Sequence, residues 1–353
     1  MRYHLSLKAL LCVTTMLAHA LVCQTSVGAE AEISESTIES VKELKQTESV
    51  SDVKGKRVKI GLALGGGGTR GAAHIGVLRV LEKEGIPIDY IAGTSIGAIV
   101  GGLYCAGASL DDIEKMVEKK TLKHAYFTVP LWFRVAVVPV FFVPRALGYP
   151  RYDGLYRGKK FANFLNKSVS AENQKIENFK IPFAAVVASL GDGKSHTITT
   201  GSLGRALQAS SAIPILRRPV EMNDDLYVDG GIVNNLPVSE VRAMGADLVI
   251  AVNVDEKLSG HDMRQLRKIG SVGNRVINMI LCRVDSEQIK SADILIHPDV
   301  NNIGLLSLDK ADAYRAISAG KTAAEAKVEQ IKEAMLKFNE PKLDASEKLA
   351  PTE

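Results

Sequence analysis

The sequence predicts an α/β fold, a three-layer α/β/α sandwich around a mainly parallel central sheet. Short apolar runs typical of buried strands alternate with segments whose apolar residues recur at helical spacing, as in parallel sheets covered on both faces. Glycine-rich stretches also follow the first two predicted strands. Ligand sites in such folds lie at the carboxyl ends of the strands, so we expect both stretches at one edge of the sheet.

Periodicity places the individual elements. The first two strands are expected at 58–64 and 88–93, each followed by a helix, at 71–85 and 96–107. Further strands are expected at 183–190, 226–231, 247–254 and 293–298, and further helices at 109–119, 155–166, 202–211, 236–244 and 309–336.

The composition is that of an ordinary globular protein. The 353 residues are 46% hydrophobic and 24% charged, and the net charge of +4 is small for this length. Lys and Arg are spread along the chain, so no nucleic-acid partner is expected. The mild basicity would favour contact with an anionic membrane surface.

The N-terminus has the features of a secretory signal peptide. Arg2 and Lys8 flank an apolar segment that ends at the small-residue site Ala18-His19-Ala20, so we expect residues 1–20 to be removed on export. Two alternatives stay open: cleavage before a lipidated Cys23, which the bulky residue at position 22 disfavours, and an uncleaved anchor. Each alternative places the protein outside the cytoplasm, in the periplasm, secreted or at a membrane.

Composition also divides the rest of the chain. Residues 21–57 are rich in Ser, Glu, Lys and Thr and have no aromatic residues, which predicts a flexible linker. Residues 338–353 form a similar tail, expected to be disordered. One domain is expected between them, at 58–337.

The first glycine-rich stretch, "LALGGGGTRGAAHIG", allows two functional interpretations. Gly66, Gly68 and Gly71 satisfy the spacing of a dinucleotide fingerprint, and Asp89 lies near where a ribose-binding acid is sought. However, a run of four glycines also exposes several backbone N–H groups at a helix N-terminus, which suits a phosphate or a tetrahedral oxyanion. Arg70 could hold this loop or add positive charge.

The second stretch, Gly93-Thr94-Ser95-Ile96-Gly97, fits the nucleophile elbow G-x-S-x-G. In isolation the pentapeptide is no more than a tight turn. One strand and one helix after another glycine loop, however, it places a serine beside a preformed anion site. A dinucleotide-binding site does not need a serine at this position, so the combination of glycine loop and elbow favours acyl transfer.

The base that would accept the serine proton is either a histidine or an aspartate. His261 and His297 follow Asp229 in the order of an α/β-hydrolase triad, but the first lies in a polar stretch and the second suits a packing role, as does His74. Asp229 ends a predicted strand and precedes two glycines that permit close backbone approach. It can bond a serine hydroxyl directly, provided that desolvation raises its pKa.

Together these stretches resemble the patatin-like phospholipase family of bacterial type. The family's oxyanion loop, elbow and D-G-[GA] motif are matched in order by Gly66 to Gly71, Gly93 to Gly97 and Asp229-Gly230-Gly231, and "ASSAIP" from Ala209 matches a further block. The resemblance spans a motif core at 58–255, and the region 256–337 looks like the C-terminal part of bacterial members.

The resemblance implies a catalytic dyad of Ser95 as nucleophile and Asp229 as general base. It implies no metal, no cofactor and no histidine base, and its substrates are acyl esters of lipids, mainly phospholipids and lysophospholipids. Two rival functions remain, a histidine-dependent esterase and a non-catalytic nucleotide- or anion-binding protein. The resemblance assigns the oxyanion hole to Gly66, Gly67 and Gly68, and supporting positions are expected at Arg70, Gly93, Gly97, Gly230 and Gly231.

The most apolar stretch of the mature chain is 129–144, "VPLWFRVAVVPVFFVP". Its three prolines and one arginine argue against a membrane-spanning helix. We expect either an interfacial segment that contacts lipid or a buried cap that packs on the sheet.

Overall fold

The computed structural model describes residues 57–130, 133, 154–258, 263–267, 271–307 and 309–339. The predicted signal peptide, Cys23, the linker up to residue 56, most of the segment 129–144, His261 and the tail from residue 340 lie outside the described residues and stay predictions. Within the described residues, no helix is long and apolar enough to cross a membrane.

The described strands form one mixed sheet, and the predicted α/β class is confirmed. Its parallel part consists of β3 (Phe183–Ser189), β2 (Tyr90–Thr94), β1 (Ile60–Leu64), β7 (Leu248–Val252) and β8 (Ile294–Ile296), in that spatial order. Beyond β3 the pairing is antiparallel: β6 (Asp225–Asp229) pairs with β3 and β5 (Val220–Met222) pairs with β6, while β4 (Ser195–Ile198) also pairs with β3.

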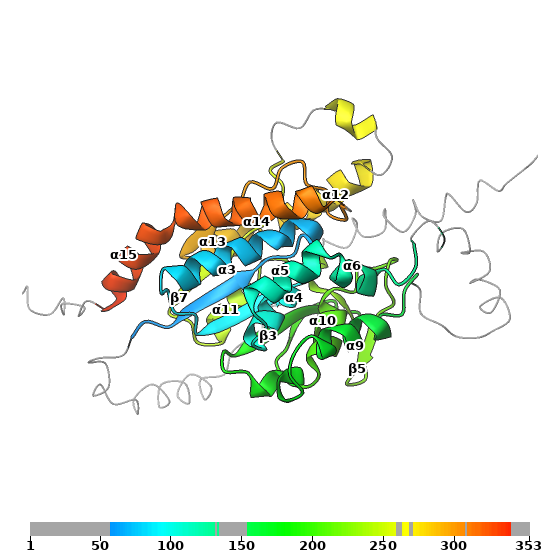
Figure 1. Ribbon diagram of the computed structural model, residues 1–353, viewed down its shortest axis with the longest axis horizontal. Coiled ribbons are helices and arrows are strands. Elements are labelled where there is room, and N and C mark those ends of the chain that lie inside the picture. The colour runs from blue at the N-terminus through cyan, green and yellow to red at the C-terminus, as the bar shows by residue number, and fades with distance from the viewer. Residues whose placement is uncertain are drawn as a thin grey trace, which may run out of the picture. The chain divides into compact units, whose positions relative to one another are not determined.

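The strand sequences explain how the helices cover the two faces. In β1 the large residues Ile60, Leu62 and Leu64 join the main core, while Gly61 and Ala63 face the opposite side. A Cβ on Gly61 would lie 2.0 Å from Val241, so the glycine lets α11 (Val238–Ala243) approach closely. Figure 1 shows α3 (Ala73–Lys83), α5 (Leu110–Glu118) and α14 (Lys310–Glu325) over the other face.

Several predicted boundaries differ from the observed ones, the helix expected at 155–166 begins only at Lys159, and strands β4 and β5 were not expected. Residues 68–72 form a 3₁₀ turn before α3, and Gly230–Ile232 form another where a strand was expected to continue. The helix expected at 309–336 is two helices, α14 and α15 (Val328–Asn339). The Lys327 amide donates to the carbonyl of Ala324, three residues earlier, and not to the residue four earlier as in an α-helix. This break between the two helices lets Val328 and Ile331 reach the core.

Six further α-helices belong to the described residues. They are α4 (Ile96–Cys105), α6 (Thr121–Tyr126), α9 (Lys159–Lys167), α10 (Leu203–Ser210), α12 (Ser271–Val284) and α13 (Ser286–Ser291).

Candidate active site

Ser95 occupies a strained turn between β2 and α4. Its backbone lies at φ 54° and ψ −117°, a conformation that side chains rarely adopt and that persists only where the surroundings enforce it. A Cβ on Gly93 would lie 2.5 Å from the Ala98 amide, and one on Gly97 would lie 2.2 Å from the Leu64 carbonyl oxygen. Both elbow positions therefore require glycine. The turn is fixed further by the Ser95 amide, which donates to Ser210 Oγ at 2.9 Å.

Asp229 meets Ser95 although 134 positions separate them in the chain. Strand β3 brings them together, because Thr94 pairs with Val186 and Asp229 pairs with the next residue, Val187. The Ser95 hydroxyl donates to Asp229 Oδ2 at 2.7 Å. The other carboxylate oxygen accepts from the Gly231 amide at 2.9 Å, so the Asp-Gly-Gly turn fixes the carboxylate orientation.

The environment of Asp229 changes its proton affinity. The side chain is buried, and this burial raises its pKa to about 6, although the hydrogen bonds from Gly231 and Ser95 act in the opposite direction. An aspartate with this pKa is a much better proton acceptor near neutral pH than one in water, and it is still mostly ionised there.

The glycine loop lies directly against Ser95, and its amides have different partners. A Cβ on Gly66 would lie 3.2 Å from Ser95 Cβ and 2.4 Å from Asn235 Oδ1, so no larger residue fits. The Gly66 amide donates to the Asn235 carbonyl at 3.2 Å. Gly68 has φ +57°, and the Thr69 amide after it donates to the Leu305 carbonyl at 2.8 Å. The amides of Gly67 and Gly68 have no such backbone acceptor among the described residues.

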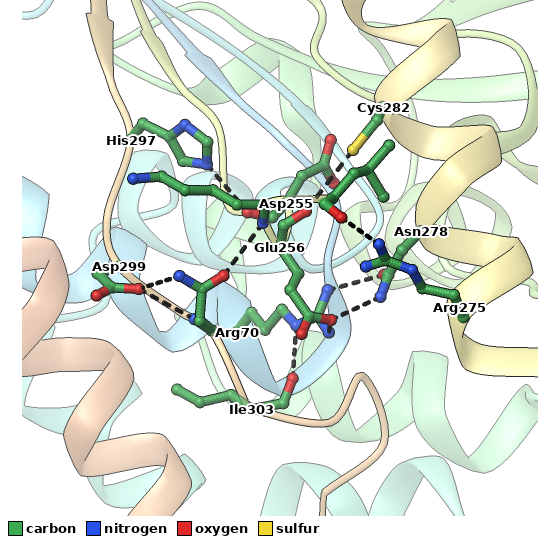
Figure 2. A network of polar contacts seen from close by, with 12 residues as sticks. Arg70, Asp255, Glu256, Arg275, Asn278, Cys282, His297, Asp299 and Ile303 are labelled. Carbon is green, nitrogen blue, oxygen red and sulfur yellow. Dashed lines mark hydrogen bonds and ion pairs between the residues drawn. The ribbon is translucent and has the colours of Figure 1, made fainter. Parts of the chain in front are cut away.

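Arg70 holds the loop from inside the protein and does not point its charge at Ser95. The side chain is 1% exposed and donates to Ile303, Asn278 and Glu256 at 2.6, 2.8 and 2.9 Å. Figure 2 shows this network, in which the guanidinium group joins the loop to segments that follow β7. Of the two roles expected for Arg70, the structure supports the first.

Comparison with known proteins places this geometry in a family. A family model described as "Patatin-like phospholipase" matches residues 62–242. The chain belongs to the patatin-like phospholipase family. This family assignment confirms the resemblance seen in the sequence.

Individual patatin-like relatives are larger proteins. The chain is 36% identical over 195 residues to lysophospholipase NTE1 of Yarrowia lipolytica, a match that covers 55% of this chain and 12% of that protein. It is 34% identical over 202 residues to an NTE family protein of Mycobacterium bovis, covering 57% and 51%. Among solved structures, VipD from Legionella pneumophila aligns with a TM-score of 0.45 and 14% identity, over 82% of this chain and 73% of that one. The chain thus matches about an eighth of the first relative and half of the second.

A cavity of about 150 Å³ opens beside Ser95 in the patatin-like domain. Its walls are mostly apolar and come from α4, α6, α9 and the segment around Leu305, and lysine side chains also line it. The lining includes Ile96, Ile99, Val100, Val117, Leu122, Phe127, Phe161, Ile213, Leu305 and Leu306, together with Lys120, Lys123 and Lys310.

The described histidines are all engaged elsewhere or exposed. His74 is fully buried and bonds the Gly65 carbonyl at 2.8 Å, and burial lowers its pKa to about 4. His297 bonds the Asp255 carbonyl at 3.0 Å, His196 contacts Asp192, and His124 is exposed. None of the hydrogen bonds found for these four described side chains involves Ser95.

Asp89 does not occupy a ribose-binding position. Its carboxylate accepts from the Ile60 amide and from Arg57, at the beginning of β1 and therefore at the edge of the sheet opposite the glycine loop. The dinucleotide interpretation of this loop thus loses its acidic partner.

Asn235 and Asp285 are site residues that the sequence motifs did not reveal. Asn235 lies between the glycine loop and the Asp-Gly-Gly turn, and its side-chain amide donates to Asp285 at 2.8 Å. The Leu236 amide also donates to Asp285, at 2.8 Å. Burial raises the pKa of Asp285 and of its neighbour Asp255, and the nearby Asp285 carboxyl group raises the pKa of Asp255 further. Asn235 lies in "NNLP", just after the Asp-Gly-Gly turn, and no motif marks Asp285.

Proposed function

We propose that the protein is a serine acyl hydrolase that cleaves fatty-acyl esters of phospholipids or lysophospholipids through Ser95 and Asp229. The observation that carries this proposal is the 2.7 Å hydrogen bond from Ser95 Oγ to the buried Asp229 carboxylate. The serine lies at a strained elbow, which presents its hydroxyl, and its partner has the proton affinity of a useful base.

In the first half-reaction, Ser95 Oγ attacks the ester carbonyl while its proton passes to Asp229. The tetrahedral oxyanion is stabilised by backbone amides, and we assign this role to Gly67 and Gly68, because the Gly66 amide already donates to Asn235. When the intermediate collapses, the glycerol oxygen leaves with the proton held by Asp229, and the fatty acid stays esterified to Ser95.

In the second half-reaction, Asp229 accepts a proton from a water molecule as its oxygen attacks the acyl-serine carbonyl. Collapse releases the fatty acid and returns the proton to Ser95 Oγ, so the aspartate serves twice as base and twice as acid. The apolar cavity beside Ser95 suits the acyl chain, whose burial would supply binding energy.

The direct test compares wild type with Ser95→Ala and Ser95→Thr on lysophosphatidylcholine and diacyl phospholipids, with released fatty acids measured by mass spectrometry. We expect Ser95→Ala to lose at least about a thousandfold in rate while it keeps its fold by circular dichroism. A fluorophosphonate should label Ser95, and peptide mass spectrometry would identify the site. Full activity in Ser95→Ala, or labelling at another residue, would overturn the proposal.

The histidine-dependent esterase is tested by a separate variant. His261→Ala combined with His297→Ala should retain activity, because His297 bonds the Asp255 carbonyl and the Ser95 hydroxyl donates to Asp229. A loss comparable to that of Ser95→Ala would restore the rival mechanism.

A further inference from the structure

Helix α12 carries its apolar side chains on the outside. Val272, Val276, Met279 and Ile280 recur at helical spacing and are 44–59% exposed, and Ile277 beside them is 46% exposed. The residue on the opposite side of the helix, Asn278, is polar and only 1% exposed. This is the reverse of a helix that packs its apolar face on a core.

The buried polar network fixes the helix in this orientation. Asn278 Oδ1 accepts from Arg70 at 2.8 Å, and its Nδ2 donates to Glu256 at 2.8 Å (Figure 2). Rotating α12 to hide its apolar face would break both bonds and leave Arg70 and Glu256 buried without this partner, which is costly. The outward apolar face is therefore built into the fold.

The charged residues in the segment 263–284 are all basic. Residues 263–284 contain five basic residues and no Asp or Glu, although Lys and Arg are otherwise spread along the chain. Arg267 and Arg283 are exposed, and Arg283 lies on the same side of α12 as Val276 and Ile280. Apolar side chains flanked by arginines are typical of helices that lie in the interface of an anionic membrane.

The helix also borders the candidate active site. Leu281 of α12 lies 3.6 Å from the Cβ position of Gly231, two residues after Asp229. Ile232, which follows in the same turn, is 44% exposed. A surface in contact with α12 would thus lie beside the turn that holds the catalytic base.

We propose that the outer face of α12, formed by Val272, Val276, Ile277, Met279 and Ile280, docks on an anionic lipid surface with Arg267 and Arg283 at its rim. The proposal rests on the function proposed above, because a lipid hydrolase must take its substrate from such a surface. It places membrane contact on α12, in addition to or in place of the segment 129–144.

The test measures binding of the full chain to vesicles of phosphatidylcholine with and without phosphatidylglycerol by flotation. Val276→Gln combined with Ile280→Gln should weaken binding to both vesicles by about tenfold or more, because two apolar side chains no longer enter the interface. Arg267→Gln combined with Arg283→Gln should remove only the preference for phosphatidylglycerol. Glutamine is used because it keeps helix propensity.

A matched control uses exposed apolar residues on another helix. Leu336 and Phe338 of α15 are 66% and 53% exposed, and Figure 1 shows α15 at the other end of the domain from α12. Leu336→Gln combined with Phe338→Gln should bind vesicles like wild type. Unchanged vesicle binding by the α12 variant, or equal weakening by the α15 control, would overturn the proposal.

Two further measurements separate the possible failures. Hydrolysis of a short, soluble ester should be unchanged in the α12 variant, since this substrate needs no membrane; a wild type inactive on every ester would instead refute the proposed function. Light scattering tests for a second copy as the occupant. A vesicle-free dimer that the α12 substitutions convert to monomer would show a protein interface and overturn lipid docking.

Discussion

Arg70 and Glu256 form a buried ion pair across 186 residues of chain, with 2.9 Å between Nη2 and Oε2 and side chains only 1% and 8% exposed. The pair joins the glycine loop to the segment that follows β7. The Arg70 guanidinium group donates hydrogen bonds to Ile303, Asn278 and Glu256, so the role of Arg70 is to position the loop.

Arg70→Met should destabilise the protein by about 3–5 kcal/mol, because it leaves the Glu256 carboxylate buried without its cation. The matched control is Arg79→Met, which removes a partly exposed ion pair with Asp111 and Glu114 and should cost less than about 1 kcal/mol. Urea unfolding measures both free energies. Equal costs for the two variants would contradict a positioning role for the buried pair.

The rate should depend on the ionisation of Asp229. Because burial raises the pKa of this carboxyl to about 6, the base is protonated and inactive at lower pH. We expect kcat/KM on a soluble ester to rise about tenfold per pH unit below this value and to level off above it. A profile that is flat through pH 6, with the fold intact, would exclude Asp229 as the titrating base.

Replacing this carboxylate should also change how stability depends on pH. The Asp229 pKa rises from 3.8 to about 6 on folding, so the folded state binds the proton more tightly and wild type loses stability as pH rises between these values. Asp229→Asn never carries the charge. It should be inactive, and its stability relative to wild type should grow across this interval by on the order of 1–3 kcal/mol.

Thermal unfolding at several pH values would reveal the effect. Ser95→Ala serves as the control, because it also inactivates the enzyme but retains the buried carboxyl. If both variants shifted with pH in the same way, the stability difference would not come from the Asp229 charge.

Gly68→Ala should lower activity because it changes the shape of the glycine loop. The position has φ +57°, and a Cβ there would lie 2.0 Å from the Leu305 carbonyl oxygen, so the loop must shift from its place beside Ser95. Displacing an oxyanion donor should lower kcat by about a hundredfold or more. Gly85→Ala is the control, since Gly85 has φ +64° but nothing within 4 Å, and it should cost only about 1 kcal/mol of stability and no activity.

Local patterns predicted the elbow and six of the described strands, though not β4 or β5, and the pairing of Ser95 with Asp229 was expected from the family resemblance. They succeeded because strand periodicity and glycine spacing are short-range signals, and because three motifs in order restrict the possible arrangements. The partners of Arg70 could not be predicted in this way, since Asn278 and Ile303 are more than 200 positions away and carry no motif.

Other features depended on contacts that a linear pattern does not contain. The break between α14 and α15 has no Gly or Pro to mark it and follows from how Val328 and Ile331 dock. The hydrogen bond from the Gly66 amide to the Asn235 carbonyl could not be predicted either, because it depends on how the folded sheet brings these two residues together. Helix α12 was not among the predicted elements, and its outward apolar face follows from the burial of Asn278 in the folded protein.

The long spacing between partners has a consequence for when the enzyme becomes active during its synthesis. The bond from Arg70 to Ile303 closes a loop of 233 residues, and the one from Ser95 to Asp229 closes a loop of 134. A nascent chain still on the ribosome, or one threaded unfolded through a translocation channel, therefore has no assembled nucleophile and base. Under the proposed function, the chain can hydrolyse lipid only after residues as distant as Arg70 and Ile303 have folded together.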